Sequence, residues 1–452
     1  MTPISILLLL LLLFQALTPS ISLNISIGTG PGISIGIGTG TPSPSPSPPN
    51  SCSCNEPQPS DFPNLKQYYA YLVIQRFKQT ITSDPLNITS TWTGFLPCTY
   101  KGFYCASPPY SPQTPTIFSI DFNNFHLSAP TLSGFIDNLP DLSLFHANSN
   151  FFSGNLPNLT SLPYFYEFDI SNNKFSGPFP STSLLPLSQL TFLDLRYNQF
   201  SGTVPSFLFS KDLDVLFLNN NLFGQTLPQN LGNSPVAYLT LANNGFTGTI
   251  PASLCNAADT LAEVLFLHNK LSGCLPYQIG LLRIATVFDA GDNLLTGPIP
   301  WSFACLQSIE QLNLANNYLY GRVPDVVCRL AKFGHLANFS LSGNYFTSLG
   351  ISCWPLIKSG ELDVRRNCIP GLPEQRTVEE CAWFFMKPKF CPLSIHIPCS
   401  LHSGHGSDHH DGGDLVRPSP PFRSVPGRRM VEKKRPSPAS YVSYSALAKK
   451  DN

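Results

Sequence analysis

Histidines and paired carboxylates are the side chains of this 452-residue sequence that could support acid–base chemistry. The carboxylates form two close pairs, Glu167 with Asp169 and Asp289 with Asp292. The histidines of the central part of the chain stand singly, at His126, His146, His268 and His335. Hydrolysis or phosphoryl transfer would need further groups at fixed spacing, and the sequence has neither an H-E-x-x-H motif nor a P-loop. We therefore expect a protein that is not an enzyme and that needs no cofactor and no metal ion.

The composition narrows the class of protein further. Charged residues make up 12% of the chain and hydrophobic residues 42%, with 44 Pro, 31 Gly and 13 Cys at a formal net charge of zero. A nucleic-acid-binding domain is usually strongly basic, so we expect no nucleic-acid partner. Many cysteines are unusual in the reducing cytosol. The composition predicts a secreted, turn-rich protein.

Both ends of the sequence have features of segments outside a folded core. Residues 1–22 contain a leucine-rich apolar run, too short to cross a bilayer core of about 30 Å, that is typical of a signal peptide. Residues 23–60 form a Gly/Ser/Pro-rich linker. Residues 400–452 form a His-rich and then basic Pro/Ser tail that we expect to be disordered. No other stretch reaches about eighteen apolar residues, so we expect no membrane span.

One sequence frame recurs ten times in the centre of the chain. Its fourth copy, LDLRYNQFSGTVP, has apolar residues at Leu193 and Leu195, followed by Asn198, Phe200 and Gly202. A period of about 24 residues in this frame is the signature of a leucine-rich repeat. The asparagines that mark the copies are Asn123, Asn150, Asn173, Asn198, Asn221, Asn244, Asn269, Asn293, Asn317 and Asn344.

The frame has a direct physical interpretation. The two apolar residues of each copy point inward from a short strand, the residue between them points outward, and the asparagine bonds backbone groups of the following turn. A single copy cannot bury its apolar face alone, so the copies stack. We predict an α/β solenoid, a plant-type leucine-rich repeat with about ten repeats over residues 117–350 and a parallel sheet on its concave face.

Segments on both sides of the repeats are expected to form disulfide-stapled caps. The N-terminal cap, residues 61–116, starts with a helix-like run and contains Cys98 and Cys105, close enough in sequence for a disulfide to close the loop. The C-terminal cap, residues 351–399, is rich in cysteine.

Further covalent links are predicted within the repeats. Cys305 and Cys328 follow the repeat proline at similar distances and are expected to pair, and Cys255 with Cys274 is a second candidate pair. Thirteen cysteines leave one thiol over, so a free thiol and a disulfide-linked homodimer both remain open. Four Asn-x-Ser/Thr sequons predict N-glycosylation, at Asn24, Asn87, Asn158 and Asn338.

The cap sequences are more specific than the repeat. FPNLKQYYAYLVIQRFKQTI before the repeats, and VLFLHNKLSGCLPYQIGLL and ELDVRRNCIPGLPEQRTVEEC late in the chain, resemble the plant leucine-rich repeat extensin family over about residues 61–391. Members of that family carry a long extensin domain of Ser and Pro runs, whereas this tail has only short RPSP motifs with Tyr441 and Tyr444. The chain thus resembles an extensin-less relative.

The resemblance implies a location and a set of partners. It implies a secreted protein of the cell wall and apoplast, acting in cell-wall integrity and growth signalling. The repeat domain is then expected to bind small basic cysteine-rich peptides of the rapid alkalinization factor type, with a plasma-membrane receptor kinase and cell-wall polysaccharide as further partners.

Outward positions of the predicted concave sheet are where such a partner would bind. They carry two acidic patches with aromatic residues between them. The first patch is Glu167, Asp169 and Asp194; the second is Glu263, Asp289 and Asp292; the aromatic residues are Phe192, Phe217 and Tyr238. The acids would attract a cationic peptide and the aromatics would anchor it. The alternative is that the charges only keep this face soluble.

Two other functions fit the same sequence. Plant inhibitors of polygalacturonase share LxxNxLxGxxP repeats, so the chain is alternatively an inhibitor of a wall-degrading enzyme. A structural wall glycoprotein is the third hypothesis, although it would need a Pro/Tyr cross-linking domain. Only the peptide hypothesis predicts binding to a basic ligand that weakens with salt.

Overall fold

The computed structural model describes residues 56–108, 110–333, 336–388, 390–391 and 447 of the chain. The predicted signal peptide, nearly all of the linker and the predicted tail other than Leu447 lie outside these residues, as does the sequon at Asn24. Within the described ranges, no helix is long and apolar enough to cross a membrane.

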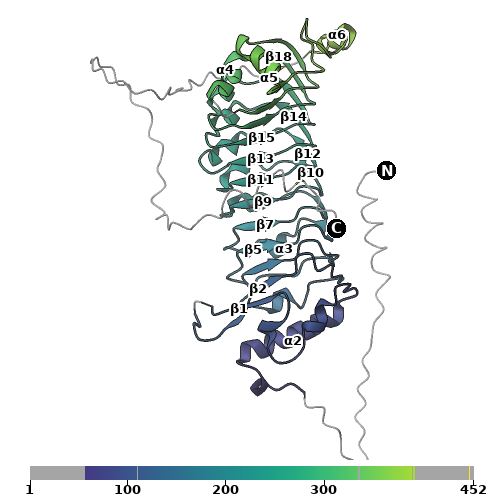
Figure 1. Ribbon diagram of the computed structural model, residues 1–452, viewed down its shortest axis with the longest axis vertical. Helices are drawn as coiled ribbons and strands as arrows, with labels where there is room; N and C mark the ends of the chain where they lie inside the picture. Colours follow the sequence, from purple (N-terminus) through teal and green to yellow (C-terminus); the bar gives the residue numbers. More distant parts are fainter. Residues whose placement is uncertain (1–55, 109, 334–335, 389, 392–446, 448–452) are drawn as a thin grey trace, which may run out of the picture. The chain divides into compact units, whose positions relative to one another are not determined.

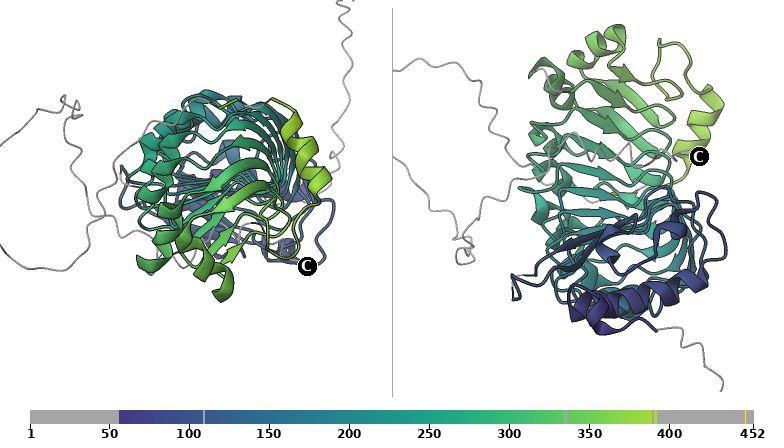
Figure 2. Two further views of the ribbon diagram at one scale, coloured as in Figure 1. Left: turned by 90° about the horizontal axis from the view of Figure 1, so that it is seen from above. Right: turned by 60° about the horizontal axis from the view of Figure 1, so that its bottom comes forward.

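The described chain is a leucine-rich repeat solenoid whose coils stack one on another (Figure 1, Figure 2). A twelve-stranded sheet runs along the concave side, and its strands are parallel except that β1 is antiparallel to β2. Its strands are β1 (Phe103–Ala106), β2 (Thr116–Asp121), β3 (Leu144–His146), β5 (Glu167–Asp169), β7 (Phe192–Asp194), β9 (Val215–Phe217), β11 (Tyr238–Thr240), β13 (Glu263–Leu265), β15 (Val287–Asp289), β17 (Gln311–Asn313), β19 (Asn338–Ser340) and β21 (Leu362–Asp363). This is the predicted fold class.

A second parallel sheet, which the sequence analysis did not predict, follows the first along each coil. It is built from the residues around the repeat Phe and Gly, and the repeat Gly of one coil pairs with the repeat Phe or Leu of the next. Its strands are β4 (Ser153–Gly154), β6 (Lys174–Pro178), β8 (Gln199–Gly202), β10 (Leu222–Thr226), β12 (Gly245–Gly248), β14 (Lys270–Cys274), β16 (Leu294–Gly297), β18 (Tyr318–Val323) and β20 (Tyr345–Leu349).

Short helical turns close the coils on the convex side. They are α3 (Ser181–Leu184), η5 (Ser206–Ser210), η6 (Leu231–Asn233), η7 (Ala252–Ala257), η8 (Tyr277–Leu281), η9 (Trp301–Cys305), α4 (Asp325–Cys328) and η10 (Arg329–Phe333). Most begin directly after the repeat proline, whose fixed φ and missing N–H suit the start of a helix.

A buried asparagine in each coil ties that coil to the one before it. The side-chain amide of Asn198 donates to three carbonyl oxygens, including that of Ile170 at 2.9 Å, and its Oδ1 accepts the N–H of Phe175 at 3.0 Å. The pattern repeats from Asn150 to Asn367. The asparagine ladder therefore satisfies backbone groups that would otherwise be buried without partners.

The first copy lies outside this ladder. Asn123 is half-exposed, and its Oδ1 accepts the N–H of Asn148 at 2.8 Å. Phe118, Ile120 and Phe122 alternate with polar residues, so the apolar pair of the frame fits two registers, and the structure buries the second pair. The prediction that Asn123 starts the ladder is wrong for this reason.

Phenylalanines of the repeat frame form a continuous stack inside the coils. The rings of Phe175, Phe200, Phe223 and Phe246 succeed one another at centroid distances of 6.3–6.4 Å and with small interplanar angles. Gly202 follows at the end of β8 with φ +78°, in the left-handed region that glycine adopts without strain.

Helix α2 (Leu65–Thr80) covers the N-terminal end of the solenoid, as the run of apolar residues predicted. The side chain of Asn64 caps it by accepting the N–H of Gln67 at 3.0 Å. Its buried face carries Phe77, whose ring stacks on that of Phe135 with a centroid distance of 3.8 Å. The remaining elements of this end are η1 (Pro59–Asp61), η2 (Ile88–Thr91), η3 (Pro97–Thr99) and η4 (Ile136–Asn138).

Disulfides staple both ends. The predicted bond between Cys98 and Cys105 is present in the N-terminal cap. At the C-terminal end, η11 (Ile351–Cys353), α5 (Trp354–Ser359) and α6 (Val378–Met386) follow the last coils. Between residues that the structure describes, three disulfides hold this end: Cys274–Cys391, Cys328–Cys353 and Cys368–Cys381.

Both disulfides predicted within the repeats are wrong. Cys328 ends α4 and bonds to the cysteine of the following coil, not to Cys305 of the coil before it, and Cys305 is itself disulfide-bonded. Cys255 is a free thiol in η7 on the convex side, whereas Cys274 ends a strand of the second sheet. These two cysteines therefore lie on different sides of their coils.

Three of the sequons fall on described residues. Asn87, Asn158 and Asn338 are all exposed. Their glycosylation stays a prediction.

Candidate functional site

The strands of the concave sheet bury their middle residue and turn the first and third outward. In β5, buried Phe168 separates Glu167 from Asp169. Asp169 pairs in register with Asp194 of β7, and Asp194 with Phe217 of β9. Equivalent outward residues therefore form columns that run from coil to coil along the concave face.

The three acids of the first predicted patch lie together on β5 and β7, and two of them have basic partners. His146 Nε2 lies 2.9 Å from Glu167 Oε2. Arg196 Nε lies 2.9 Å from Asp194 Oδ2, within ion-pair distance but outside hydrogen-bond geometry. Asp169 lies between the two pairs in the sheet.

Burial and neighbouring charges shift the ionisation of this group. Burial raises the pKa of Asp194, 1% exposed, well above its usual value; Asp169 adds to the rise and Arg196 opposes it. Burial alone would lower the pKa of His146, but the hydrogen bond to Glu167 and the nearby carboxylates leave it raised. The negative charge of the first patch is thus partly neutralised by His146 and Arg196 and by the raised pKa of Asp194.

The second predicted patch is more dispersed. Glu263 and Asp289 lie on adjacent strands, and both are buried, at 8% and 1% exposed. Asp289 accepts the side-chain N–H of Asn313 at 3.1 Å. Asp292 lies past the end of β15 with φ 51°, where its Oδ2 is 3.5 Å from His268 Nδ1. The structure therefore places Glu263 and Asp289 on adjacent strands but in different columns, since Glu263 pairs with Val287 and Asp289 with Leu265, and it places Asp292 beyond the strand end.

Apolar side chains fill the outward positions between the two acidic patches. Val215 and Phe217 of β9 form a cluster with Phe192 and Tyr238 of the adjoining strands. Phe217 is 2% exposed, and the Arg196 guanidinium lies 5.4 Å from its ring centroid. The three aromatic residues singled out from the sequence therefore lie on neighbouring strands.

A second apolar cluster adjoins the second acidic patch. It consists of Ala242, Leu265 and Val287, with Leu267 and Leu447 packed against it. Leu265 and Val287 occupy outward strand positions, where the frame usually has a polar residue. An apolar residue at such a position is the sequence signal that could have predicted this cluster. Leu447 comes from the C-terminal tail, and nothing in the repeat pattern points to it.

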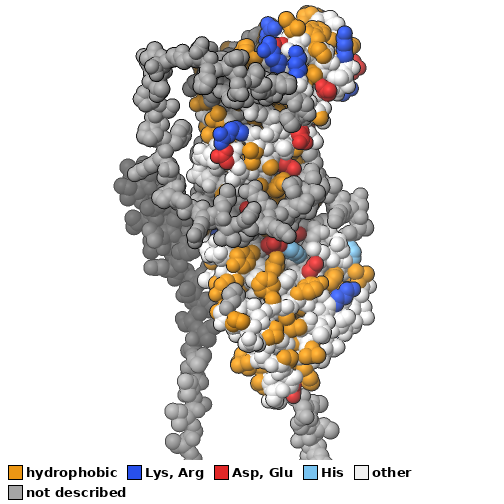
Figure 3. Space-filling view, turned by 60° about the vertical axis from the view of Figure 1, so that its left-hand side comes forward, with side chains coloured by type: hydrophobic (Ala, Val, Ile, Leu, Met, Phe, Trp, Pro, Cys, Tyr) orange, Lys and Arg blue, Asp and Glu red, His pale blue; other side chains and the backbone are white. Residues whose placement is uncertain are grey.

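His146 and Arg196 were also missed as members of the site. His146 pairs in register with Asp169, and Arg196 follows Asp194 by two residues, so each occupies a predictable outward position. In the space-filling view of Figure 3, acidic side chains and a histidine lie near mid-height, above a hydrophobic area in the lower half of the molecule.

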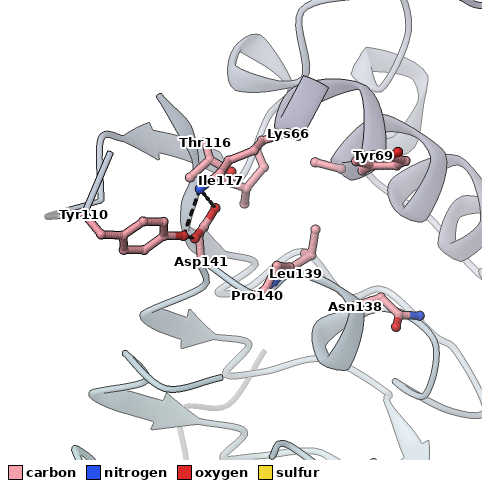
Figure 4. A pocket seen from close by; sticks show the side chains of 10 residues that line it. Lys66, Tyr69, Tyr110, Thr116, Ile117, Asn138, Leu139, Pro140 and Asp141 are labelled. Carbon is pink, nitrogen blue, oxygen red and sulfur yellow. Dashed lines mark hydrogen bonds and ion pairs between the residues drawn. The ribbon is translucent and has the colours of Figure 1, made fainter. Parts of the chain in front are cut away.

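A separate cavity of about 120 Å³ lies between α2 and the first coils (Figure 4). Lys66 Nζ bonds Asp141 Oδ2 at 3.0 Å and Tyr110 Oη at 2.8 Å, and Tyr110 also donates to Asp141. The Lys66 ammonium also lies 4.4 Å from the Tyr110 ring centroid. Lys66, Tyr110 and Asp141 satisfy one another's hydrogen-bonding groups. This cluster therefore has a structural role, in which it links the N-terminal cap to the first coils.

Non-covalent binding is the chemistry that the concave face supports best. It combines carboxylates that can accept charge-assisted hydrogen bonds with apolar side chains that can be desolvated by a partner. In the part of the chain that the structure describes, no group of three or more His, Cys, Asp or Glu residues could hold a metal ion.

Comparison with known sequences identifies related proteins. The Leucine Rich Repeat family matches residues 189–210 and 236–257. Leucine-rich repeat extensin-like protein 7 of Arabidopsis thaliana is 40% identical over 330 residues, which cover 73% of this chain and 75% of that protein. The pollen-specific leucine-rich repeat extensin-like protein 3 of the same plant is 41% identical over 331 residues, 73% of this chain and 45% of that protein.

The matched part is smaller in other relatives. Leucine-rich repeat extensin-like protein 1 of Arabidopsis thaliana is 42% identical over 111 residues, which are 24% of this chain and only 15% of that protein. The chain thus spans a minor part of some of the curated relatives it matches.

Solved structures share the solenoid. The Arabidopsis receptor kinase HAESA, in complex with the peptide hormone IDA and the co-receptor SERK1, has a TM-score of 0.58 at 27% identity; the match covers 66% of this chain and 50% of that one. A plant ice-binding protein has a TM-score of 0.54 at 21% identity, covering 69% of this chain and 98% of that one. The second likeness concerns the fold alone.

Proposed function

The chain belongs to the leucine-rich repeat extensin-like family, and from this premise we propose that it is a secreted, non-catalytic protein of the plant cell wall that binds a small basic peptide on its concave sheet. The peptides would be cysteine-rich peptides of the rapid alkalinization factor type, as the family resemblance implies. A receptor kinase and wall polysaccharide would be further partners.

One observation carries the proposal: acidic groups flank an apolar cluster on a single rigid sheet. Glu167 and Asp169 lie on one side of the Val215–Phe217 cluster, and Glu263 lies on the other. Carboxylates on both sides can steer a cationic ligand and accept hydrogen bonds from its Lys and Arg side chains. Desolvated aromatic residues between them supply the kind of centre that dominates binding energy in protein interfaces.

Two further points support this proposal. The HAESA solenoid, similar to this one, is described as holding a peptide hormone. Disulfides at both ends, including Cys98–Cys105 and Cys328–Cys353, are typical of proteins that fold in an oxidising compartment, which suits secretion to the wall.

The test is a titration of the full-length glycosylated protein with a panel of synthetic basic cysteine-rich peptides at two salt concentrations. Removing charge by the double change Glu167→Gln and Asp169→Asn should weaken binding about tenfold and flatten its salt dependence. The matched control is Asp259→Asn, which removes an exposed carboxylate paired with Arg283 away from the concave strands and should leave binding unchanged.

Two outcomes of this titration would contradict the proposed function. If folded wild-type protein binds no member of the panel, the peptide function is wrong, and slowing of pectin cleavage by polygalacturonase becomes the next assay. If the double variant and the control weaken binding equally, the concave face is not the site.

A further inference from the structure

Outward residues of the concave sheet are buried in the middle coils only. The third residue of each strand is half-exposed in β3 and β5, buried in every strand from β7 to β15, and half-exposed again in β17 and β19. The coils share one backbone geometry and one pairing register, so the coil itself does not account for the difference. The burial indicates that the middle of this face is covered.

Leu447, from the C-terminal tail, lies at this covered place. It is half-buried, and it packs against the buried side chains of Ala242, Leu265 and Val287, with Leu267 beside it. These four residues come from three successive coils, so the cluster that Leu447 joins spans several strands of the sheet.

A hydrogen bond fixes the backbone of the same residue. The hydroxyl of Tyr197 donates to the carbonyl oxygen of Leu447, across 250 residues of sequence. Tyr197 follows β7, whereas the cluster against which the Leu447 side chain packs belongs to later coils. The backbone and the side chain of Leu447 are therefore held by different coils.

The sequence around Leu447 complements this surface. Ala446 and Ala448 flank it, and Lys449 and Lys450 follow directly. The strands of the cluster carry the carboxylates of Glu263 and Asp289, whose charge is opposite in sign to that of these two lysines.

We propose that the middle of the concave sheet is the docking surface for the chain's own C-terminal segment, residues 441–452, with Leu447 as its anchor. The segment occupies the surface to which a basic peptide was assigned above, and therefore competes with that peptide; this competition rests on the proposed function. Because the segment is tethered, its effective concentration is of the order of millimolar, enough for weak docking to hinder a free ligand.

The experiment uses full-length proteins and a fluorescent synthetic peptide of residues 440–452. Leu447→Asp puts a charge into the apolar cluster and should free the sheet, so this variant should bind the added peptide about tenfold more tightly than wild type does. A peptide that itself carries Leu447→Asp should not bind either protein. The matched control is Leu415→Asp, the same change elsewhere in the tail, which should behave as wild type.

A second variant tests the sheet side of the contact. Tyr197→Phe removes only the hydroxyl, which the added peptide also needs, so Leu447→Asp combined with Tyr197→Phe should bind the added peptide about threefold more weakly than Leu447→Asp alone. Thermal melting checks that both variants fold. Equal affinity of wild type and Leu447→Asp for the added peptide, or no binding to either, would overturn the docking.

The same proteins separate this proposal from the proposed function. If a basic cysteine-rich peptide binds Leu447→Asp more tightly than wild type, both stand. If it binds the two proteins equally, the docking segment does not compete and only the proposed function stands. If the 440–452 peptide binds Leu447→Asp but no basic cysteine-rich peptide does, the docking stands and the proposed function fails.

Discussion

At the N-terminal end of the solenoid a helix and a cluster of aromatic rings cover the first coil, whereas at the C-terminal end disulfides such as Cys274–Cys391 and Cys328–Cys353 hold the last coils together. Trp92 and Phe77 are buried in the N-terminal cap. In α6 of the C-terminal cap, by contrast, Trp383 and Met386 are largely exposed. Each end must shield the apolar core that an open solenoid would expose. The comparison teaches that aromatic packing contributes more at the N-terminal end, which has the short Cys98–Cys105 bond, and that long-range cross-links contribute more at the C-terminal end.

Removing a disulfide should therefore affect the C-terminal end most. Replacing Cys274 and Cys391 with Ala opens a loop of 117 residues and should lower the free energy of unfolding by about 5 kcal/mol on the chain-entropy relation. Replacing Cys98 and Cys105, separated by 7, should cost only about 2 kcal/mol. Denaturant unfolding of the two double variants measures both costs. Equal costs would contradict the comparison.

Truncating a buried aromatic side chain should destabilise the N-terminal end more than the C-terminal end. Phe77→Ala leaves a cavity within a closed cluster and should cost about 4 kcal/mol. Phe384→Ala removes a ring stacked on Tyr345 in the C-terminal cap, where exposed neighbours can relax, and should cost roughly half as much. Thermal unfolding followed by circular dichroism compares them, with exposed Tyr69→Ala as the neutral control. A larger loss for Phe384→Ala would show that packing matters more at the C-terminal end.

The asparagine ladder also distinguishes the ends, with a smaller effect. Asn367 is buried within the C-terminal cap and its amide donates to three carbonyls, so Asn367→Ala should cost about 2–3 kcal/mol through unsatisfied backbone groups. Asn123, outside the ladder at the N-terminal end, should cost less than about 1 kcal/mol when changed to Ala. Hydrogen exchange of the neighbouring amides locates the loss, and similar protection in both variants would refute the difference.

The smallest expected effect is on pH dependence. The raised pKa of His146 means that its pairing with Glu167 stabilises the fold below the unfolded value of 6.5 and is lost as pH rises through the folded pKa. The hydrogen bond from Arg365 lowers the pKa of Asp363, so that pairing stabilises the fold above 3.8 and is lost as pH falls through the folded pKa. Each contributes less than about 1 kcal/mol.

Two variants separate these terms. His146→Gln should remove stability on the acidic side of pH 6.5 only, and Asp363→Asn should remove it at neutral pH but not near pH 2. Unfolding free energies measured from pH 2 to 8 report both. A profile for His146→Gln parallel to that of wild type would contradict the assignment.

Sequence reasoning was sufficient where one signal repeats. Ten copies of one frame predicted the concave strands, and the ladder follows the predicted asparagines from Asn150 onward. The second sheet escaped prediction because its strands are short and include Gly, so they show no alternation of their own. The register of the first copy was ambiguous because Phe118, Ile120 and Phe122 offered two equivalent apolar pairs.

The candidate site was predicted less completely than the fold. Columns of outward residues follow from the repeat, so Glu167, Asp169 and Asp194 were placed together from the sequence. The contact of Leu447 spans hundreds of residues and depends on how a tail meets the finished sheet, which no local pattern encodes. The disulfide of Cys274 with Cys391 was missed for the same reason.

That disulfide also determines how the molecule would respond to mechanical load. Between Cys274 and Cys391 lie the last coils and most of the C-terminal cap. When the chain is pulled by its two ends, tension passes directly from one sulfur to the other and bypasses the segment between them. The two cysteines are 117 residues apart in sequence, and the chain between them, about 400 Å when extended, cannot extend until the disulfide is reduced. The earlier coils would unfold first, and the segment from Cys274 to Cys391 would resist extension as one block.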